Sequence, residues 1–168
     1  ENEWYLDQDN LILYAWGDLS SSWRGKVQDY AFSFTNCDDI TLSGIDFFAT
    51  TVSFINCERA RVEHGKFDYP SCTKRMLGID ATVPEMTKFD GGGNHIFYNN
   101  EIRYADTPAI YMTSGTDNKI ENCLFEYIDW SSADLPSLMM TVYMRGTGSI
   151  FNGNTAHTTG ASAFLDVN

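Results

Sequence analysis

The side chains of this chain best suited to acid–base chemistry are its aspartates, among them Asp90, Asp129 and Asp166. Hydrolysis of a glycosidic bond needs two carboxylates about 5 to 10 Å apart, one protonated as the acid and one ionised as nucleophile or base. Asp106 and Asp129 occupy matching positions about 23 residues apart in a repeat, so they could form a close pair in which one pKa rises. Two solvated turn residues explain the same spacing, and we favour that explanation. A catalytic pair formed by Asp166 and a carboxylate from a loop is an equally open alternative.

Lys88 and Arg145 point to a second reaction, elimination from a uronate-containing polymer. In that reaction a basic side chain takes the proton beside the uronate carboxylate, and a cation or another arginine neutralises the carboxylate. Ca²⁺ is the cofactor that such chemistry would use, but no group of acidic residues has the spacing of a convincing calcium site. Hydrolysis is therefore the first expectation and elimination the second.

The composition of the 168 residues predicts one globular unit with an acidic surface. Apolar residues make up 43% and aromatic residues 14%, while 23 acidic and 11 basic side chains give a formal net charge of -12. This charge argues against nucleic acid or an anionic membrane as the partner. No apolar run approaches the roughly 20 residues of a membrane span, and the first residues lack the pattern of a signal peptide.

Internal repetition indicates which elements position these side chains. The segment Phe34 to Cys37 matches Phe54 to Cys57 after a shift of about 20 residues. Further along, Asn100 to Tyr104 matches Cys123 to Tyr127 and then Asn154 to His157, with spacings of about 23 and about 31 residues. Apolar positions recur in columns while the residues between them vary, which is typical of rungs stacked into a solenoid.

Each repeat contains short runs that alternate between apolar and polar residues with the two-residue period of β-strands. Turns rich in Gly, Asn and Asp separate the runs, as at Gly91 to Asn94 and at Gly115 to Asn118. Residues 1–29 differ, because strand-like runs at Trp4 to Leu6 and Leu11 to Tyr14 flank a polar turn and predict a β-hairpin. The expected organisation is a hairpin and linker over residues 1–29 and a solenoid over residues 30–168.

These repeats resemble the pectate-lyase-like family of right-handed parallel β-helix proteins over approximately residues 30 to 168. The resemblance implies an all-β, right-handed, single-stranded parallel β-helix of about six rungs, but no particular reaction, because the fold hosts many activities. On the family's scheme, the first strands of the rungs are Phe32–Phe34, Val52–Phe54, Lys88–Asp90, Ile110–Thr113, Val142–Arg145 and Ala163–Asp166. The chain stops inside the last of these strands, so the helix is expected to be truncated there and completed by further rungs or by end-to-end association.

In the family, sugar polymers lie across the outward face of the first-strand sheet. Alternation places one outward column there, made of Lys88, Tyr111, Tyr143 and Phe164. The next outward column consists of Asp90, Thr113, Arg145 and Asp166. Aromatic rings offer apolar area to sugar C–H surfaces, and the charged groups can bond hydroxyls or carboxylates. An aromatic column that only stabilises the sheet is an equally weighted alternative.

Two long loops lead from third strands back to first strands, where the family has the walls of its cleft. The first, Tyr69 to Thr87, contains Glu85, and the second, Ile128 to Met140, contains Trp130 and Asp134. Loops of this length in a compact fold are commonly functional. Trp130 is a candidate platform for a sugar ring, although a hydrophobic anchor that holds the loop down is slightly preferred.

An internal ladder of amides is expected at the tight turns, where Asn100, Cys123 and Asn154 share a column. Cys123 interrupts this ladder, which is therefore partial. Cys37 and Cys57 stack one rung apart and are expected to stay reduced, because parallel side chains disfavour the dihedral angle of a disulfide.

A further column with an arginine between carboxylates runs along the third strands and consists of Asp68, Arg103, Glu126 and His157. Opposite charges on neighbouring rungs are a common surface ladder, and this explanation is favoured over a catalytic one. The isolated histidines His64 and His95 near turns are likewise expected to be structural.

The leading functional expectation is a secreted or cell-surface protein that acts on a polysaccharide, with a glycoside hydrolase favoured over a polysaccharide lyase. The competing class is a non-catalytic solenoid that serves as an adhesive, a fibre or a carbohydrate-binding module. A carboxylate pair within about 10 Å across an open groove would favour hydrolysis. The absence of such a pair would favour elimination or a non-catalytic solenoid.

Overall fold

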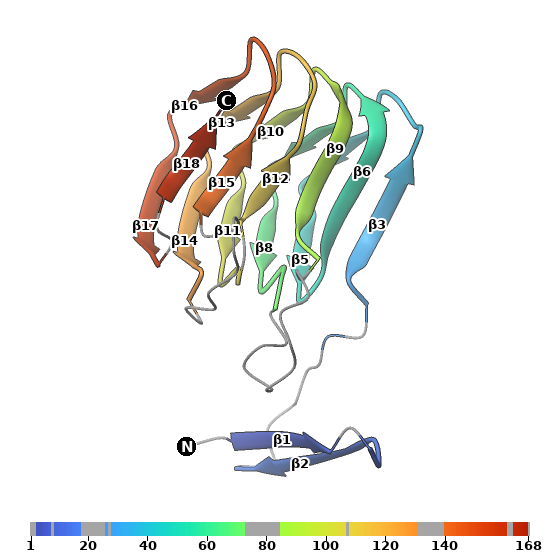
Figure 1. Ribbon diagram of the computed structural model, residues 1–168, viewed down its shortest axis with the longest axis vertical. Coiled ribbons are helices and arrows are strands. Elements are labelled where there is room, and N and C mark those ends of the chain that lie inside the picture. The colour runs from blue at the N-terminus through green and yellow to red at the C-terminus, as the bar shows by residue number, and fades with distance from the viewer. Residues whose placement is uncertain are drawn as a thin grey trace.

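The computed structural model describes residues 3–7, 9–17, 26, 28–72, 85–106, 108–130, 140–160 and 163–167, and every regular element in these ranges is a β-strand. From residue 30 onward the strands form three parallel sheets, and the chain visits each sheet in turn before it returns to the first (Figure 1). The prediction of an all-β solenoid of parallel strands is therefore confirmed.

The first sheet collects the strands predicted to open each turn. Its members are β3 (Tyr30–Thr35), β6 (Thr51–Glu58), β9 (Thr87–Gly93), β12 (Ile110–Met112), β15 (Met140–Met144) and β18 (Ala163–Val167). The predicted first strands lie within these bounds, apart from one extra residue at the ends of β12 and β15.

The other two sheets are narrower, because most of their strands contain three residues. The second sheet holds β4 (Thr41–Ser43), β7 (Arg61–Glu63), β10 (Ile96–Tyr98), β13 (Lys119–Glu121) and β16 (Ile150–Asn152). The third sheet holds β5 (Asp46–Phe48), β8 (Lys66–Asp68), β11 (Glu101–Arg103), β14 (Leu124–Ile128) and β17 (Thr155–Thr159).

Near the N-terminus, β1 (Glu3–Asp7) and β2 (Ile12–Trp16) form an antiparallel pair. The polar turn between them is closed by the Asp7 carboxylate, which accepts hydrogen bonds from the backbone N–H of Asn10 at 3.1 Å and from its side-chain amide at 2.9 Å. The predicted hairpin is therefore present, and its two strands form a separate two-stranded sheet (Figure 1).

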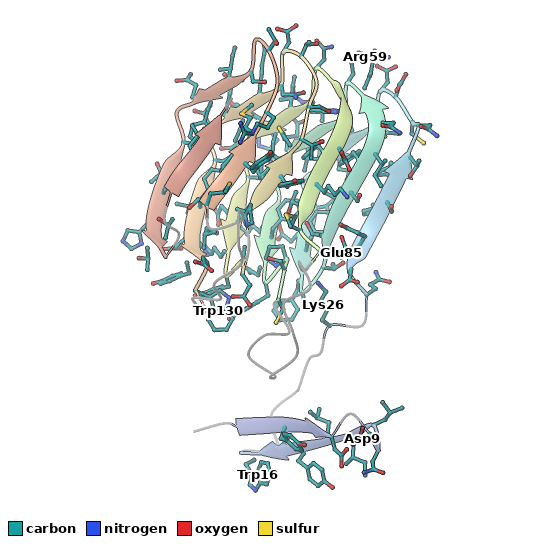
Figure 2. All side chains as sticks on the ribbon, viewed as in Figure 1. Asp9, Trp16, Lys26, Arg59, Glu85 and Trp130 are labelled. Atoms are coloured by element: carbon teal, nitrogen blue, oxygen red, sulfur yellow. The ribbon has the colours of Figure 1, made fainter. Side chains whose placement is uncertain are left out.

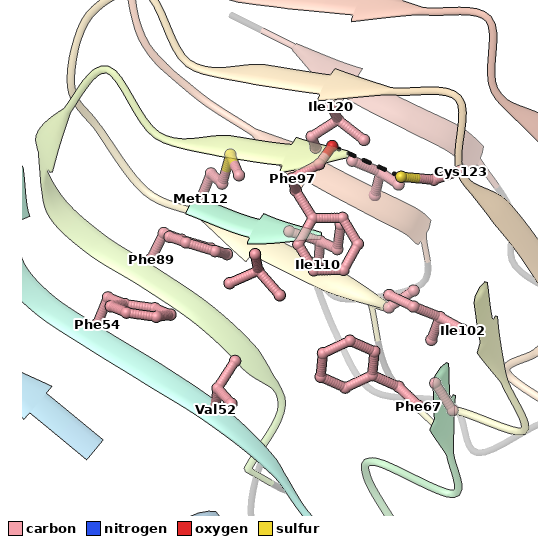
Figure 3. Close-up of a cluster of buried hydrophobic side chains, with 14 of the residues drawn as sticks. Val52, Phe54, Phe67, Phe89, Phe97, Ile102, Ile110, Met112, Ile120 and Cys123 are labelled. Atoms are coloured by element: carbon pink, nitrogen blue, oxygen red, sulfur yellow. Dashed lines mark hydrogen bonds between the residues drawn. The ribbon is translucent and has the colours of Figure 1, made fainter. Parts of the chain in front are cut away.

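Stacked aromatic rings fill the interior between the sheets (Figure 3). The ring of Phe54 lies 5.2 Å from that of Phe34 and 4.9 Å from that of Phe89, and the three rings are nearly parallel. On the third sheet, Phe47 and Phe67 stack with centroids 4.6 Å apart. Because neighbouring rungs are about 4.8 Å apart, equivalent residues on successive rungs meet face to face, and the apolar columns follow from this spacing.

The glycine-rich segment at Gly91 to Gly93 forms the end of β9, so the prediction of a turn beginning there was wrong. Gly92 has a φ of +79°, and a Cβ atom on it would lie 1.5 Å from the carbonyl oxygen of Cys57. The strand therefore continues through a point where two backbones approach too closely for any side chain.

The predicted amide ladder lies between the second and third sheets. Asn100 accepts a hydrogen bond from the backbone N–H of Gly65 at 2.8 Å and donates one to the carbonyl of Val62 at 2.9 Å. Asn154 makes the equivalent bonds to the N–H of Cys123 and the carbonyl of Ile120, each at 2.8 Å. Cys123 interrupts the ladder as predicted, and each asparagine ties its own rung to the preceding one.

A second buried polar column lies at the turn between the first and second sheets. The side chain of His95 is fully buried, and its Nδ1 accepts a hydrogen bond from the N–H of Ala60 at 3.2 Å. Asn118 occupies the same position one rung later and accepts a hydrogen bond from the N–H of His95 at 3.0 Å. The structural explanation for His95 is thereby supported, and sequence reasoning missed that it belongs to a ladder.

His95 predicts a loss of stability in mildly acidic solution. Burial lowers the pKa of His95 from its ordinary value of 6.5, and protonation of Nδ1 would remove the acceptor for the N–H of Ala60. Below about pH 6.5 the unfolded chain binds a proton at this residue that the folded chain does not, so stability falls by up to about 1.4 kcal/mol per pH unit. Urea unfolding between pH 7 and pH 5 measures this slope.

The matched variant for this measurement is His95→Asn, because asparagine occupies the same column at Asn118. We expect the variant to unfold with a smaller dependence on pH over that interval, whereas His64→Asn, at an exposed position, should retain the wild-type slope. Equal slopes for the wild type and His95→Asn would contradict the assignment.

The four cysteines are free thiols in the structure. Cys37 and Cys57 donate hydrogen bonds from Sγ to the carbonyls of Thr35 and Ile55, at 3.2 and 3.4 Å. Each of these two thiols is thus bonded to a carbonyl of its own strand region, two residues earlier in the chain.

Candidate functional site

The outward face of the first sheet carries most of the predicted site residues. Strand register aligns Ser53, Lys88, Tyr111 and Tyr143 in one column, because each residue pairs with the next. Asp90, Thr113 and Arg145 lie two residues after Lys88, Tyr111 and Tyr143, and Thr113 and Arg145 lie just beyond the ends of β12 and β15. The structure thus brings these six predicted side chains, two basic, one acidic and three bearing hydroxyls, onto one surface.

The last strand of this sheet was predicted two residues out of register. Tyr143 pairs with Asp166, and Val142 pairs with Leu165, so Asp166 takes the position that was given to Phe164. The prediction aligned the strand by its aromatic residue, whereas the register follows the buried apolar neighbours on the inner face. The side chains of Phe164 and Asp166 lie outside the described residues.

The two tyrosines of this face stack on each other. The rings of Tyr111 and Tyr143 are 4.6 Å apart with an interplanar angle of 23°, and the guanidinium of Arg145 lies 4.9 Å from the centre of the Tyr143 ring. The Tyr143 ring therefore contacts both a second phenol ring and a guanidinium. Burial raises the pKa of Tyr111, so its phenol stays protonated at neutral pH and can donate a hydrogen bond.

Asp90 is held in its ionised form. The hydroxyl of Thr113 donates a hydrogen bond to its carboxylate at 2.6 Å, and Nζ of Lys88 lies 3.4 Å from the other oxygen. The hydrogen bond from Thr113, and then Lys88, lower the pKa of Asp90 below its ordinary value. Asp90 is therefore suited to accept hydrogen bonds or to act as a base, and unsuited to the role of a general acid.

A cluster that sequence reasoning missed lies at the edge of the same face. The hydroxyl of Tyr30 donates a hydrogen bond to the carboxylate of Glu85, and Ser53 also hydrogen-bonds to Tyr30. Burial, followed by the charge and hydrogen bond of Glu85, raises the pKa of Tyr30. The two residues are far apart in the sequence, and the only sequence signal was the position of Glu85 just before β9.

The backbone positions of Asp90 and Asp166 are widely separated on this face. The two residues are three rungs and two residues apart, which corresponds to about 16 Å between their Cα atoms. This Cα separation exceeds the roughly 5 to 10 Å that a glycosidase pair requires between its carboxyl groups.

Asp106 and Asp129 lie elsewhere, beyond the ends of the third-sheet strands, and both are buried, with 0% and 5% of their surface exposed. The explanation as solvated turn residues was therefore wrong. Tyr104 and Tyr127 adopt left-handed backbone conformations, which redirect the chain inward in a way that strand alternation does not predict. Asp129 is not brought together with Asp90, and its burial removes it from contact with a polymer.

Trp130 follows Asp129 and lies over the end of the third sheet (Figure 2). Its indole Nε1 donates a hydrogen bond to the carbonyl of Tyr104 at 3.1 Å, and its ring meets that of Tyr69 nearly at a right angle. This contact fits the predicted anchor, yet 46% of the side chain is exposed. Asp134, in the same predicted loop, lies outside the described residues.

The charged column on the third sheet forms the ion pairs of a surface ladder. Arg103 lies 3.0 Å from Glu126 and 3.2 Å from Glu101, and Glu126 lies 3.5 Å from Nδ1 of His157. Asp68 is the register neighbour of Arg103 on the preceding rung. These partly exposed pairs each contribute about 0 to 1 kcal/mol.

A hollow of about 390 Å³ lies at the turns between the first and second sheets, away from the predicted face, and is lined in part by Asp39, Arg59 and Asn94. Both of its cationic groups are neutralised within the protein, because Arg59 contacts Asp39 at 2.6 Å and Arg61 contacts Glu63 at 2.5 Å. The hollow therefore offers an anionic ligand no uncompensated positive charge.

Among the described residues, no group of three or more His, Cys, Asp or Glu side chains could hold a metal ion. In the same ranges, no helix is long and apolar enough to cross a membrane. Comparison of the chain with protein-family models, curated proteins and solved structures gives no match.

Proposed function

We propose that this protein binds an acidic polysaccharide along the outward face of the first sheet. The observation that carries the proposal is the cluster of Lys88, Tyr111, Tyr143 and Arg145, which presents two cations and two phenol hydroxyls on one regular surface. Uronate residues carry both carboxylates and hydroxyls, the groups that such side chains recognise.

The two basic groups of this face match the carboxylates of an acidic ligand. Lys88 on β9 and Arg145, which follows β15, lie on this face together with the carboxylates of Asp90 and Glu85. A flat surface with a rung every 4.8 Å or so also suits a linear polymer, which can contact several rungs at once.

Binding is favoured over hydrolysis because Asp90, which Thr113 and Lys88 hold ionised, is unsuited to the role of the general acid that hydrolysis needs. Elimination is the second candidate, since Lys88 and Arg145 could act on a uronate bound at this surface. Absorbance of unsaturated uronates, measured on polygalacturonate and alginate with and without Ca²⁺, tests elimination. Release of reducing ends from the same polymers tests hydrolysis.

Replacement of Arg145 by glutamine is expected to weaken polyuronate binding about tenfold, because it removes both a cation and the guanidinium that packs on Tyr143. Affinity electrophoresis in gels containing polygalacturonate or alginate measures the change, with dextran as the neutral polymer. The matched control is Lys66→Gln on the third sheet, which removes the same charge from an exposed position.

Unretarded migration of the wild type in both polyuronate gels would refute the proposed function. Equal losses for Arg145→Gln and Lys66→Gln would show that binding follows net charge and not this face.

We further infer that the coil is right-handed and has about six turns. Connections between parallel strands of one sheet are right-handed in about 98% of cases, and each turn here is a connection of that kind. A secreted or cell-surface location follows from the proposed ligand, since acidic polysaccharides are extracellular polymers.

A further inference from the structure

Three tyrosines on successive rungs adopt a backbone conformation that disfavours them. Tyr69, Tyr104 and Tyr127 have φ values of 56°, 58° and 55°, in the left-handed region where glycine and asparagine are the usual residues. This conformation costs roughly 1 to 2 kcal/mol for a residue with a Cβ atom. Ala49 has the same conformation, with a φ of 56°, at the equivalent position of an earlier rung, so the turn itself requires it.

The three rings form one stack along the edge of the third sheet. Tyr69 and Tyr104 are 4.7 Å apart with an interplanar angle of 11°, and Tyr104 and Tyr127 are 5.0 Å apart with an angle of 3°. Phe48 adds an edge contact to Tyr69 at 5.8 Å. The ring planes thus lie across the axis of the stack, and the ring edges and hydroxyls line its side.

Trp130 lies along the side of this stack. Its ring is at 87° to that of Tyr69, and its Nε1 is bonded to the carbonyl of Tyr104. The indole plane therefore runs along the stack, and 46% of Trp130 is exposed to solvent.

Polar groups adjoin this aromatic surface. Arg103 and Glu126 lie close enough to Tyr104 to act on its hydroxyl electrostatically. The ring centre of His157 lies 6.5 Å from that of Tyr127. A flat apolar face beside hydrogen-bonding groups matches a pyranose ring, which has an apolar C–H surface and a rim of hydroxyls.

We propose that Trp130 and the tyrosine stack form a second carbohydrate site, which binds the C–H face of a neutral pyranose. It differs from the face around Arg145 in sheet and in mode of contact, since a polymer there would meet the cations of Lys88 and Arg145. This proposal does not depend on polyuronate binding at the first sheet.

Fluorescence titration with cellohexaose, mannohexaose and xylohexaose tests the site. The protein for this experiment carries Phe at Trp4, Trp16 and Trp23, so that Trp130 is the only tryptophan. We expect at least one hexasaccharide to change the emission of Trp130 saturably. Calorimetry on the otherwise unchanged chain should show that Trp130→Ala weakens binding of that sugar about tenfold or more.

The matched control is Trp16→Ala, which removes another exposed tryptophan from the hairpin and should leave sugar affinity unchanged. No response to any of the three sugars would overturn the proposal. Unchanged sugar affinity in Trp130→Ala would also overturn the proposal. If the melting temperature of that variant were lowered as well, Trp130 would be identified as a structural anchor only. Arg145→Gln should retain the neutral sugar, so the two proposed sites can fail separately.

Discussion

Replacement of Phe89 by alanine is expected to destabilise the solenoid by about 3 to 5 kcal/mol, the largest effect of a single substitution that we anticipate. The ring of Phe89 is 1% exposed and stacks on Phe54 with centroids 4.9 Å apart. It also contacts the rings of His95 and Phe97. The substitution would leave a cavity beside Phe54 and remove the ring contact between two neighbouring rungs. The cavity would lie on the inner side of β9, the strand that carries Lys88 and Asp90 on its outer side.

Urea unfolding followed by circular dichroism measures this loss. The matched control is Phe48→Ala, since Phe48 is also a strand phenylalanine but is 47% exposed, and it should cost less than about 1 kcal/mol. Similar losses for the two variants would mean that the interior stack is not the main source of stability in this region.

Replacement of Asn100 by alanine is expected to cost about 2 to 4 kcal/mol. The amide of Asn100 bridges two rungs, and its removal leaves the N–H of Gly65 and the carbonyl of Val62 without their partner in a buried turn. Each unsatisfied buried group of this kind costs about 1 to 3 kcal/mol. Thermal unfolding should therefore show a clear decrease in Tm.

Asn154→Ala is the control for this prediction, because Asn154 makes the same two kinds of bond. Its side chain is half-buried whereas Asn100 is 1% exposed, so water can replace part of the lost bonding and the cost should be smaller. A larger loss for Asn154→Ala than for Asn100→Ala would show that burial does not set the strength of the ladder.

The same features show how far the sequence predicts the fold. The repeat around Phe34 and Phe54 was sufficient to assign the first strands, because rung spacing forces equivalent apolar residues to stack. Asn100 and Asn154 were recognisable as ladder residues from their shared column. In each case a periodic pattern in the chain translates directly into a periodic contact in space.

Other features depended on contacts that leave no periodic trace. The register of β18 follows the inner pairing of Val142 with Leu165, which moved Asp166 into the column given to Phe164. Gly92 continues a strand because the carbonyl of Cys57 passes too close for a side chain. The contact between Tyr30 and Glu85 joins two segments that no repeat relates.

The residues suited to acid–base chemistry show the same division. The sequence by itself determined that the chain forms stacked parallel strands, and it placed Lys88, Asp90, Tyr111, Tyr143 and Arg145 on one outward face. Only the tertiary structure decided that Asp129 is buried, that Asp166 shares a column with Lys88, and that Trp130 contacts the tyrosine stack. The physical reason is that alternation and rung spacing are local and repetitive, whereas burial at a turn and the reach of a side chain depend on left-handed backbone positions and on neighbouring rungs.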